Sequence, residues 1–82
     1  MRYVIHTDRD IAQKECDIIN KATQHLWHDG QTKKLVQLET NYDNSLYLYL
    51  VIPEYEEYYP KGILDKATSE IPENWFDREE GL

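Results

Sequence analysis

Two histidines near the middle of the chain have a spacing that metal-binding sites use. His25 and His28 are three residues apart, and Asp29 follows them directly; at this spacing two imidazoles can share one metal ion. The sequence offers no second pair of ligands, and His6 is its remaining histidine. We therefore expect no metal and no other cofactor. His25 and His28 are predicted to be exposed near a helix end, where the helix dipole favours positive charge.

A lone cysteine and a run of carboxylates are the other reactive groups. Cys16 falls on the predicted apolar side of a helix, without the accessible, electropositive setting that activates a thiol, so it is predicted to be a buried apolar residue. Glu54, Glu56 and Glu57 could supply an acid–base pair, but their polar surroundings give no reason for a raised pKa. The sequence contains no glycine-rich phosphate loop and no serine nucleophile motif. It therefore predicts a protein that is not an enzyme.

The stretch SLYLYLVIPEYEEYYP, residues 45–60, combines many tyrosines with carboxylates. Tyrosine is favoured at protein interfaces because it offers a large rigid ring with a polar tip. Carboxylates beside such rings would add charge contacts. The predicted binding residues are Tyr47, Tyr49, Glu54, Tyr55, Glu56, Glu57, Tyr58 and Tyr59.

The net charge of −7 is unevenly distributed along the 82 residues. Residues 39–82 contain eleven acidic and three basic side chains, a net charge of −8, and residues 1–38 carry a net charge of +1. Such a surface repels phosphate backbones and attracts basic partners, and the chain has no basic patch with interleaved aromatics. Direct nucleic-acid binding is therefore disfavoured. The plainer interpretation is that the acidity keeps a small protein soluble.

Length and composition predict one folded domain, residues 1–82. Hydrophobic residues make up 40% and charged residues 30% of the chain. The longest apolar run, residues 46–52, is far shorter than the roughly 20 residues of a membrane span, and the N-terminus lacks a signal-peptide pattern. A single cysteine excludes an internal disulfide. We expect a cytoplasmic protein with no membrane contact.

The first half of the chain predicts a strand and a long helix. Residues 2–6 are a short β-type run, and Thr7 or Asp8 can cap the helix that follows. Apolar residues recur at helical spacing over residues 9–27. Asp29 and Gly30 are expected to end this helix, since glycine readily adopts the left-handed conformation.

The second half predicts a hairpin and a shorter helix. Residues 33–40 and 45–52 alternate with period two around the turn NYDN, and Pro53 ends the second strand. Residues 53–60 are predicted to form an irregular link between this strand and the second helix. A helix is expected over residues 61–70, opened by Pro60 and stopped by Pro72, and residues 77–82 are expected to be a frayed acidic tail. The predicted fold is a small α+β domain of order β-α-β-β-α, with a three-stranded sheet.

The alternation of the second hairpin strand predicts which face the long helix covers. The helix is expected to pack on Val36, Leu38 and the leucines at positions 46, 48 and 50. Tyr47 and Tyr49 would then face away, because successive strand side chains alternate. So large an apolar patch is seldom left bare. The C-terminal segment, a second copy of the chain or a partner could cover it, and internal packing by Ile63, Leu64, Trp75 and Phe76 is favoured.

Four short motifs are spread along the chain: the opening strand RYVI, KECDIIN around Cys16, the hairpin end VIP and the closing IPENWF. In these motifs and their order the chain resembles small phage or prophage reading frames. The resemblance covers most of the chain as a pattern of elements, and it implies no activity. It implies a host-directed inhibitor or a small virion or assembly component.

We therefore expect a non-catalytic, phage-type protein that inhibits or modulates a host protein with a basic surface, such as a nucleic-acid-binding protein. The alternative is a self-associating assembly component of a phage particle that forms a homodimer through the Tyr47/Tyr49 sheet face. A small enzyme is the third hypothesis. A monomer in solution would favour the first hypothesis, and a defined oligomer would favour the second.

Overall fold

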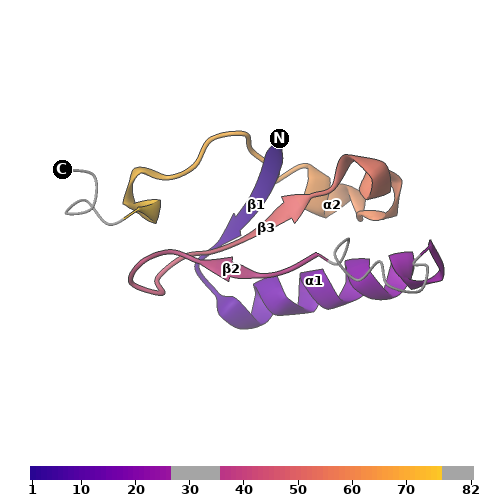
Figure 1. Ribbon diagram of the computed structural model, residues 1–82, viewed down its shortest axis with the longest axis horizontal. Coiled ribbons are helices and arrows are strands. Elements are labelled where there is room, and N and C mark those ends of the chain that lie inside the picture. The colour runs from indigo at the N-terminus through magenta and orange to yellow at the C-terminus, as the bar shows by residue number, and fades with distance from the viewer. Residues whose placement is uncertain (27–35, 77–82) are drawn as a thin grey trace.

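The computed structural model describes residues 1–26 and 36–76, and these follow the predicted order β-α-β-β-α (Figure 1). The helices and strands are β1 (Arg2–His6), α1 (Arg9–Thr23), β2 (Glu39–Thr40), β3 (Tyr47–Val51) and α2 (Lys61–Leu64), with 3₁₀-helical segments at Gln24–Leu26, Pro53–Tyr58 and Glu73–Trp75. The α+β class is confirmed, with a three-stranded sheet, a long helix on one face and a short helix towards the C-terminus. The predicted helix end at 27–30 and the predicted tail, residues 77–82, lie outside the described residues.

The sheet has the strand order β1-β3-β2, and both strand pairs are antiparallel. The central strand is β3, on which Tyr49 lies opposite Val4 of β1. The predicted turn between β2 and β3 is present, and its Asn44 has a φ of 60°, in the left-handed region that asparagine tolerates. The Asn41 carboxamide oxygen accepts hydrogen bonds from the backbone N–H groups of Ser45 and Leu46 at 2.9 and 3.0 Å. These bonds fix the end of the hairpin.

Helix α1 begins where its sequence predicts, and it buries its predicted apolar side. The Asp8 Oδ1 atom accepts hydrogen bonds from the N–H groups of Asp10 and Ile11, so Asp8 is the N-cap. The buried residues of the helix, which recur at helical spacing, are Ala12, Cys16, Ile19 and Thr23. Cys16 is therefore buried as expected, and Asp17 lies on the exposed side.

The sheet face that α1 covers is the opposite of the predicted one. Tyr49 and Val51 are 0% and 2% exposed and belong to the same core cluster as Cys16 and Ile19 of α1. The prediction that Tyr47 and Tyr49 face away from the helix is therefore wrong. Residues that lie opposite each other in a sheet share a face, so Thr40 lies on the helix side with Tyr47, and Leu48 lies on the other side.

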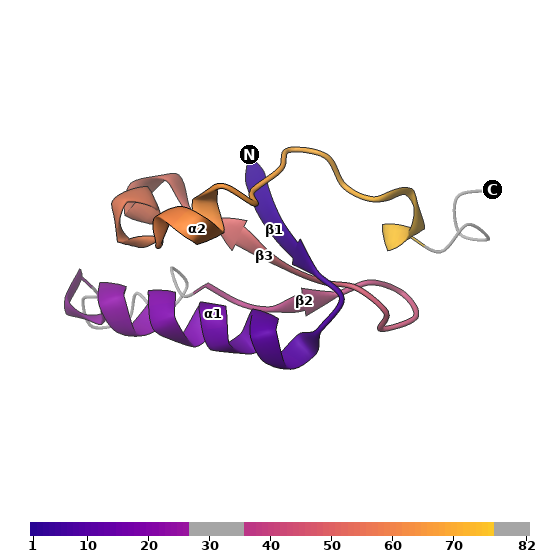
Figure 2. The same ribbon diagram turned by 180° about the vertical axis from the view of Figure 1, so that it is seen from behind.

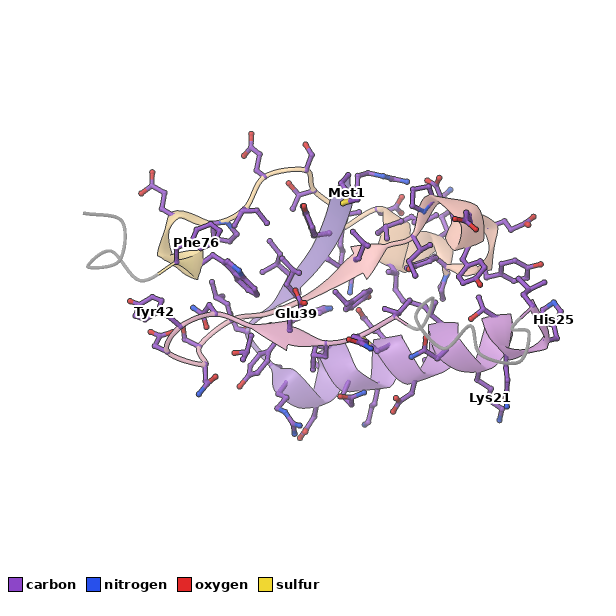
Figure 3. All side chains as sticks on the ribbon, viewed as in Figure 1. Met1, Lys21, His25, Glu39, Tyr42 and Phe76 are labelled. Carbon is purple, nitrogen blue, oxygen red and sulfur yellow. The ribbon has the colours of Figure 1, made fainter. Side chains whose placement is uncertain are left out.

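The C-terminal segment runs back past the β1 edge of the sheet, as Figures 1 and 2 show from both sides. The backbones of Tyr3 and Thr68 exchange two hydrogen bonds of 2.7 and 2.8 Å, and the Tyr42 N–H donates to the Trp75 carbonyl at 3.4 Å. Phe76, expected to help cover the sheet, is 68% exposed. In Figure 3 it lies at the same end of the molecule as Tyr42. Ile63 is buried, but in the core cluster on the α1 side.

The second helix is shorter than predicted, because α2 ends at Leu64. Ala67 and Ile71 have helical spacing from Ile63, but the backbone of Thr68 pairs with β1 instead of continuing the helix. The segment Pro53–Tyr58, expected to be irregular, is a 3₁₀-helix that starts at the proline following β3. The segment Pro53–Tyr58 and helix α2 add Tyr55 and Ile63 to the core cluster beyond the end of β3.

Replacement of Leu48 by alanine should lower the free energy of unfolding by about 2–3 kcal/mol. Leu48 is 4% exposed, and an emptied leucine site costs about 2–5 kcal/mol. The value should lie at the lower end because Tyr3, Ile5 and Leu50 of this sheet face are half-buried and can move into the space. Urea denaturation of wild type and variant measures the difference. A loss below 1 kcal/mol would mean that this face of β3 does not form part of the core.

Candidate functional site

The acidic, tyrosine-rich segment after β3 is held on the core by two buried tyrosines. Tyr55 and Tyr59 are 5% and 4% exposed and belong to the core cluster. The Tyr59 hydroxyl donates to the Leu50 carbonyl at 2.7 Å and accepts from the Ile52 N–H at 3.0 Å. This hydroxyl therefore continues the hydrogen bonding of β3 past the last residue of the strand. Burial raises the pKa of Tyr59, so the hydroxyl keeps its proton at neutral pH.

The carboxylates of the segment lie on its outer side. Glu54 and Glu57 are exposed, and Glu56 is half-buried and forms an ion pair with Arg2 of β1. Tyr58 is half-buried, and its ring makes edge-to-face contacts with Tyr55 and His25, at centroid distances of 6.5 and 5.6 Å. The outer surface of Pro53–Tyr58 thus combines two exposed carboxylates with one partly accessible aromatic ring.

The eight predicted binding residues do not form one surface. Glu54, Glu56 and Glu57 lie on the outside of Pro53–Tyr58, Tyr58 is half-buried against the core, and Tyr55 and Tyr59 are in the core. Tyr49 is buried under α1, and the Tyr47 hydroxyl donates to the Asn44 carbonyl at 3.0 Å, within the hairpin. A homodimer through the Tyr47/Tyr49 face would need α1 to leave the sheet.

A second cluster, which the sequence analysis did not single out, surrounds the carboxylate of Glu15 on α1. Its Oε1 atom accepts a hydrogen bond of 2.5 Å from the Tyr49 hydroxyl, and it lies 2.7 Å from Nε2 of His6. Its Oε2 atom lies 2.8 Å from Nζ of Lys66. We call Glu15, His6, Tyr49 and Lys66 the Glu15 cluster. It ties β1, α1, β3 and the segment after α2 together.

The electrostatics of the cluster keep Glu15 charged. Burial alone would raise the pKa of Glu15, but the hydrogen bonds from Lys66, Tyr49 and His6, with the charge of His6, outweigh it and hold the pKa below its usual value. Burial raises the pKa of Tyr49 well above its ordinary value, and the hydrogen bond to Glu15 raises it further. Tyr49 therefore stays a hydrogen-bond donor to a charged carboxylate.

Cys16, the residue after Glu15 on α1, is not an activated thiol. Burial raises the pKa of Cys16 to about 12, and the charges of Asp17 and Glu15 add to this, so the thiol stays protonated. No group of three or more His, Cys, Asp or Glu side chains in residues 1–26 and 36–76 could hold a metal ion. His28 and Asp29 of the predicted histidine pair lie outside the described residues. The Glu15 cluster is best explained as a tie between elements.

The fold and these surfaces define a small α+β domain in which a segment anchored in the core presents two exposed carboxylates, Glu54 and Glu57. Within the described part of the chain, no helix is both long and apolar enough to cross a membrane. Comparison with known proteins finds no family model that matches the chain, no similar curated protein and no similar solved structure.

Proposed function

We propose that this protein is a non-catalytic binding domain, and that the outer surface of Pro53–Tyr58 contacts a basic surface of a partner protein. The observation that carries the proposal is that buried tyrosines hold the segment Pro53–Tyr58 on the core. Tyr55 and Tyr59 fix it to the core, so that Glu54 and Glu57 project from a shaped backbone. A preformed surface loses less conformational entropy on binding than a loose acidic loop would.

The net charge of the second half of the chain supports the same role. Residues 39–82 carry a net charge of −8, and Asp65, directly after α2, is also exposed. Carboxylates around an aromatic residue suit a basic partner, because complementary charge speeds association and a buried ring slows dissociation. Tyr58 packs partly against the core, and it is the ring that keeps some surface for this contact, since Tyr55 and Tyr59 are buried.

The partner remains a prediction from the sequence. The resemblance to phage reading frames predicts a host protein with a basic surface, such as a nucleic-acid-binding protein, and an inhibitory or modulating effect. Assembly into a phage particle and a small enzyme are the alternatives, and no contact among residues 1–26 and 36–76 favours either of them.

The test begins with affinity capture from a bacterial lysate, followed by titration of the recovered protein against wild type and variants. The double variant Glu54→Gln, Glu57→Gln should associate about ten-fold more slowly at low salt, and the difference should shrink at high salt because exposed charges are screened. Tyr58→Ala should instead speed dissociation.

The matched control is Asp10→Asn with Asp17→Asn, which removes the same charge from exposed positions on α1. This control should slow association much less than the Glu54/Glu57 variant does. If the two double variants behave alike, net charge alone explains the effect, and Pro53–Tyr58 is not the interface.

A further inference from the structure

A groove runs between the first turns of α1 and the β2 side of the sheet. It encloses about 420 Å³, within the range of ligand sites in proteins. Its lining residues, which come from α1, β2 and the hairpin, are Arg9, Gln13, Leu38, Glu39, Thr40, Asn44 and Tyr47. No residue of the acidic segment Pro53–Tyr58 lines it, so the inference below does not rest on the proposed function.

One wall of the groove is the edge of the sheet. In the strand order β1-β3-β2, β2 is the outer strand, and no strand of the described residues pairs with its other side. Edge strands present backbone N–H and C=O groups that can pair with a further strand. An extended peptide that adds to a sheet edge uses these groups for affinity and side-chain pockets for specificity.

The edge is fixed in position at both ends. Before β2, the Asn20 carboxamide on α1 donates to the Val36 carbonyl at 2.9 Å and accepts from the Val36 N–H at 2.8 Å. After β2, the Asn41 hydrogen bonds hold the hairpin turn. The backbone from Val36 to Asn41 is thus preformed, which lowers the entropy lost when a peptide binds.

The side chains of the groove specify what such a peptide should carry. Leu38 and the ring of Tyr47 are half-buried and offer an apolar floor. Arg9 is exposed and forms no ion pair with another described residue. Glu39 lies opposite Leu48, so its side chain belongs to the far sheet face. Figure 3 places Glu39 on β2. Of the charged residues that line the groove, Arg9 is therefore the one whose side chain lies on the α1 side of the sheet.

We propose that this groove binds an extended peptide of a partner protein that pairs with β2, places an apolar side chain on Leu38 and Tyr47, and directs an acidic side chain to Arg9. Alternate residues of an extended chain point to the same side, so the apolar and acidic residues stand two positions apart. Because β2 is only two residues long, backbone pairing needs these side-chain contacts in addition.

The experiment is a titration, followed through the backbone amide signals of the ¹⁵N-labelled chain. The probes are two end-capped threonine heptapeptides with a leucine and a glutamate two positions apart, one in each order. We expect one of them to shift the amides of Leu38, Glu39, Thr40 and Gln13. Arg9→Gln should weaken its binding about ten-fold or more, the usual effect of losing a charged hydrogen bond. Lys14→Gln, which removes an exposed charge on α1 outside the groove, should not.

Modified peptides complete the test. Glutamine in place of glutamate should weaken binding to wild type as much as Arg9→Gln does, with little further loss when both changes are combined. Methylation of the peptide's backbone nitrogens, one at a time, should weaken binding at alternate positions, because only alternate N–H groups of an added strand point to β2. The proposal is overturned if neither original peptide shifts the β2 amides at millimolar concentration, or if Arg9→Gln and Lys14→Gln bind equally well.

Discussion

Replacement of Tyr49 by alanine should lower the free energy of unfolding by about 3–5 kcal/mol, the usual cost of truncating a core aromatic residue. Tyr49 is fully buried on the central strand, and its ring stacks near His6 with the centroids 6.3 Å apart. The substitution empties the space under α1 and removes a hydrogen bond to Glu15. Both losses act on the same contact between helix and sheet. Chemical denaturation followed by circular dichroism measures the effect.

The matched control is Tyr42→Ala, which removes the same side chain from a position that is 55% exposed. It should cost about 0.5 kcal/mol or less, as surface substitutions usually do. Tyr49→Phe separates the two parts of the Tyr49 effect, because it keeps the ring and removes only the hydroxyl. If Tyr49→Ala proves no more harmful than Tyr42→Ala, α1 does not cover this face of the sheet.

The sequence predicted the order of helices, strands and turns because helix caps, strand ends and turns depend on residues that are close together in the chain. Asp8 caps α1 through N–H groups two and three residues further along, and Pro53 follows β3 as expected of a residue that cannot donate to a ladder. Asn44 adopts the left-handed conformation at the turn. Each of these features involves residues only a few positions apart, so it can be predicted from the sequence pattern.

The buried face of β3 could not be read from the alternation, because this central strand buries residues on both sides. Leu48 and Tyr49 are both below 5% exposure, whereas the alternation alone favours the more apolar face as the one under the helix. The informative signal was on α1. Glu15 stands between Ala12 and Ile19 on the side that packs, and a carboxylate there needs hydrogen-bond donors from the sheet. Tyr49 and His6 provide them.

Contacts between residues far apart in the chain also explain why the second helix is shorter than predicted and why Tyr59 is buried and not part of a binding surface. Thr68 pairs with Tyr3, 65 positions earlier in the chain, and no local pattern contains that contact. The Tyr59 hydroxyl bonds the backbone at the end of β3, so this tyrosine in an acidic run belongs to the core. The sequence places tyrosines and carboxylates next to each other in residues 53–60. The fold then divided them into buried anchors and an exposed outer side.

Replacement of Glu15 by alanine should lower the free energy of unfolding by about 2–4 kcal/mol at neutral pH. The Glu15 side chain is 14% exposed and holds donors from three other parts of the fold. Without it the buried Tyr49 hydroxyl loses its acceptor, and His6 and Lys66 lose a charged partner; an unsatisfied buried polar group costs about 1–3 kcal/mol. Asp17→Ala, two residues along on the exposed side of α1, is the control and should cost about 0.5 kcal/mol or less.

The pH dependence distinguishes loss of a charged carboxylate from loss of packing. The folded pKa of Glu15 lies below the usual value of 4.5, so folding favours the charged form. Its electrostatic stabilisation is then fully present above that value, and it is lost as the pH falls through the lower folded pKa. Glu15→Gln keeps the shape of the side chain but cannot ionise. The stabilisation that the Glu15 charge adds to wild type over Glu15→Gln should therefore be present above about pH 4.5 and be lost as the pH falls below it. Denaturant titrations of both proteins between pH 7 and pH 3 would measure it, and a difference that stays constant over this range would show that the carboxylate contributes only through its size and shape.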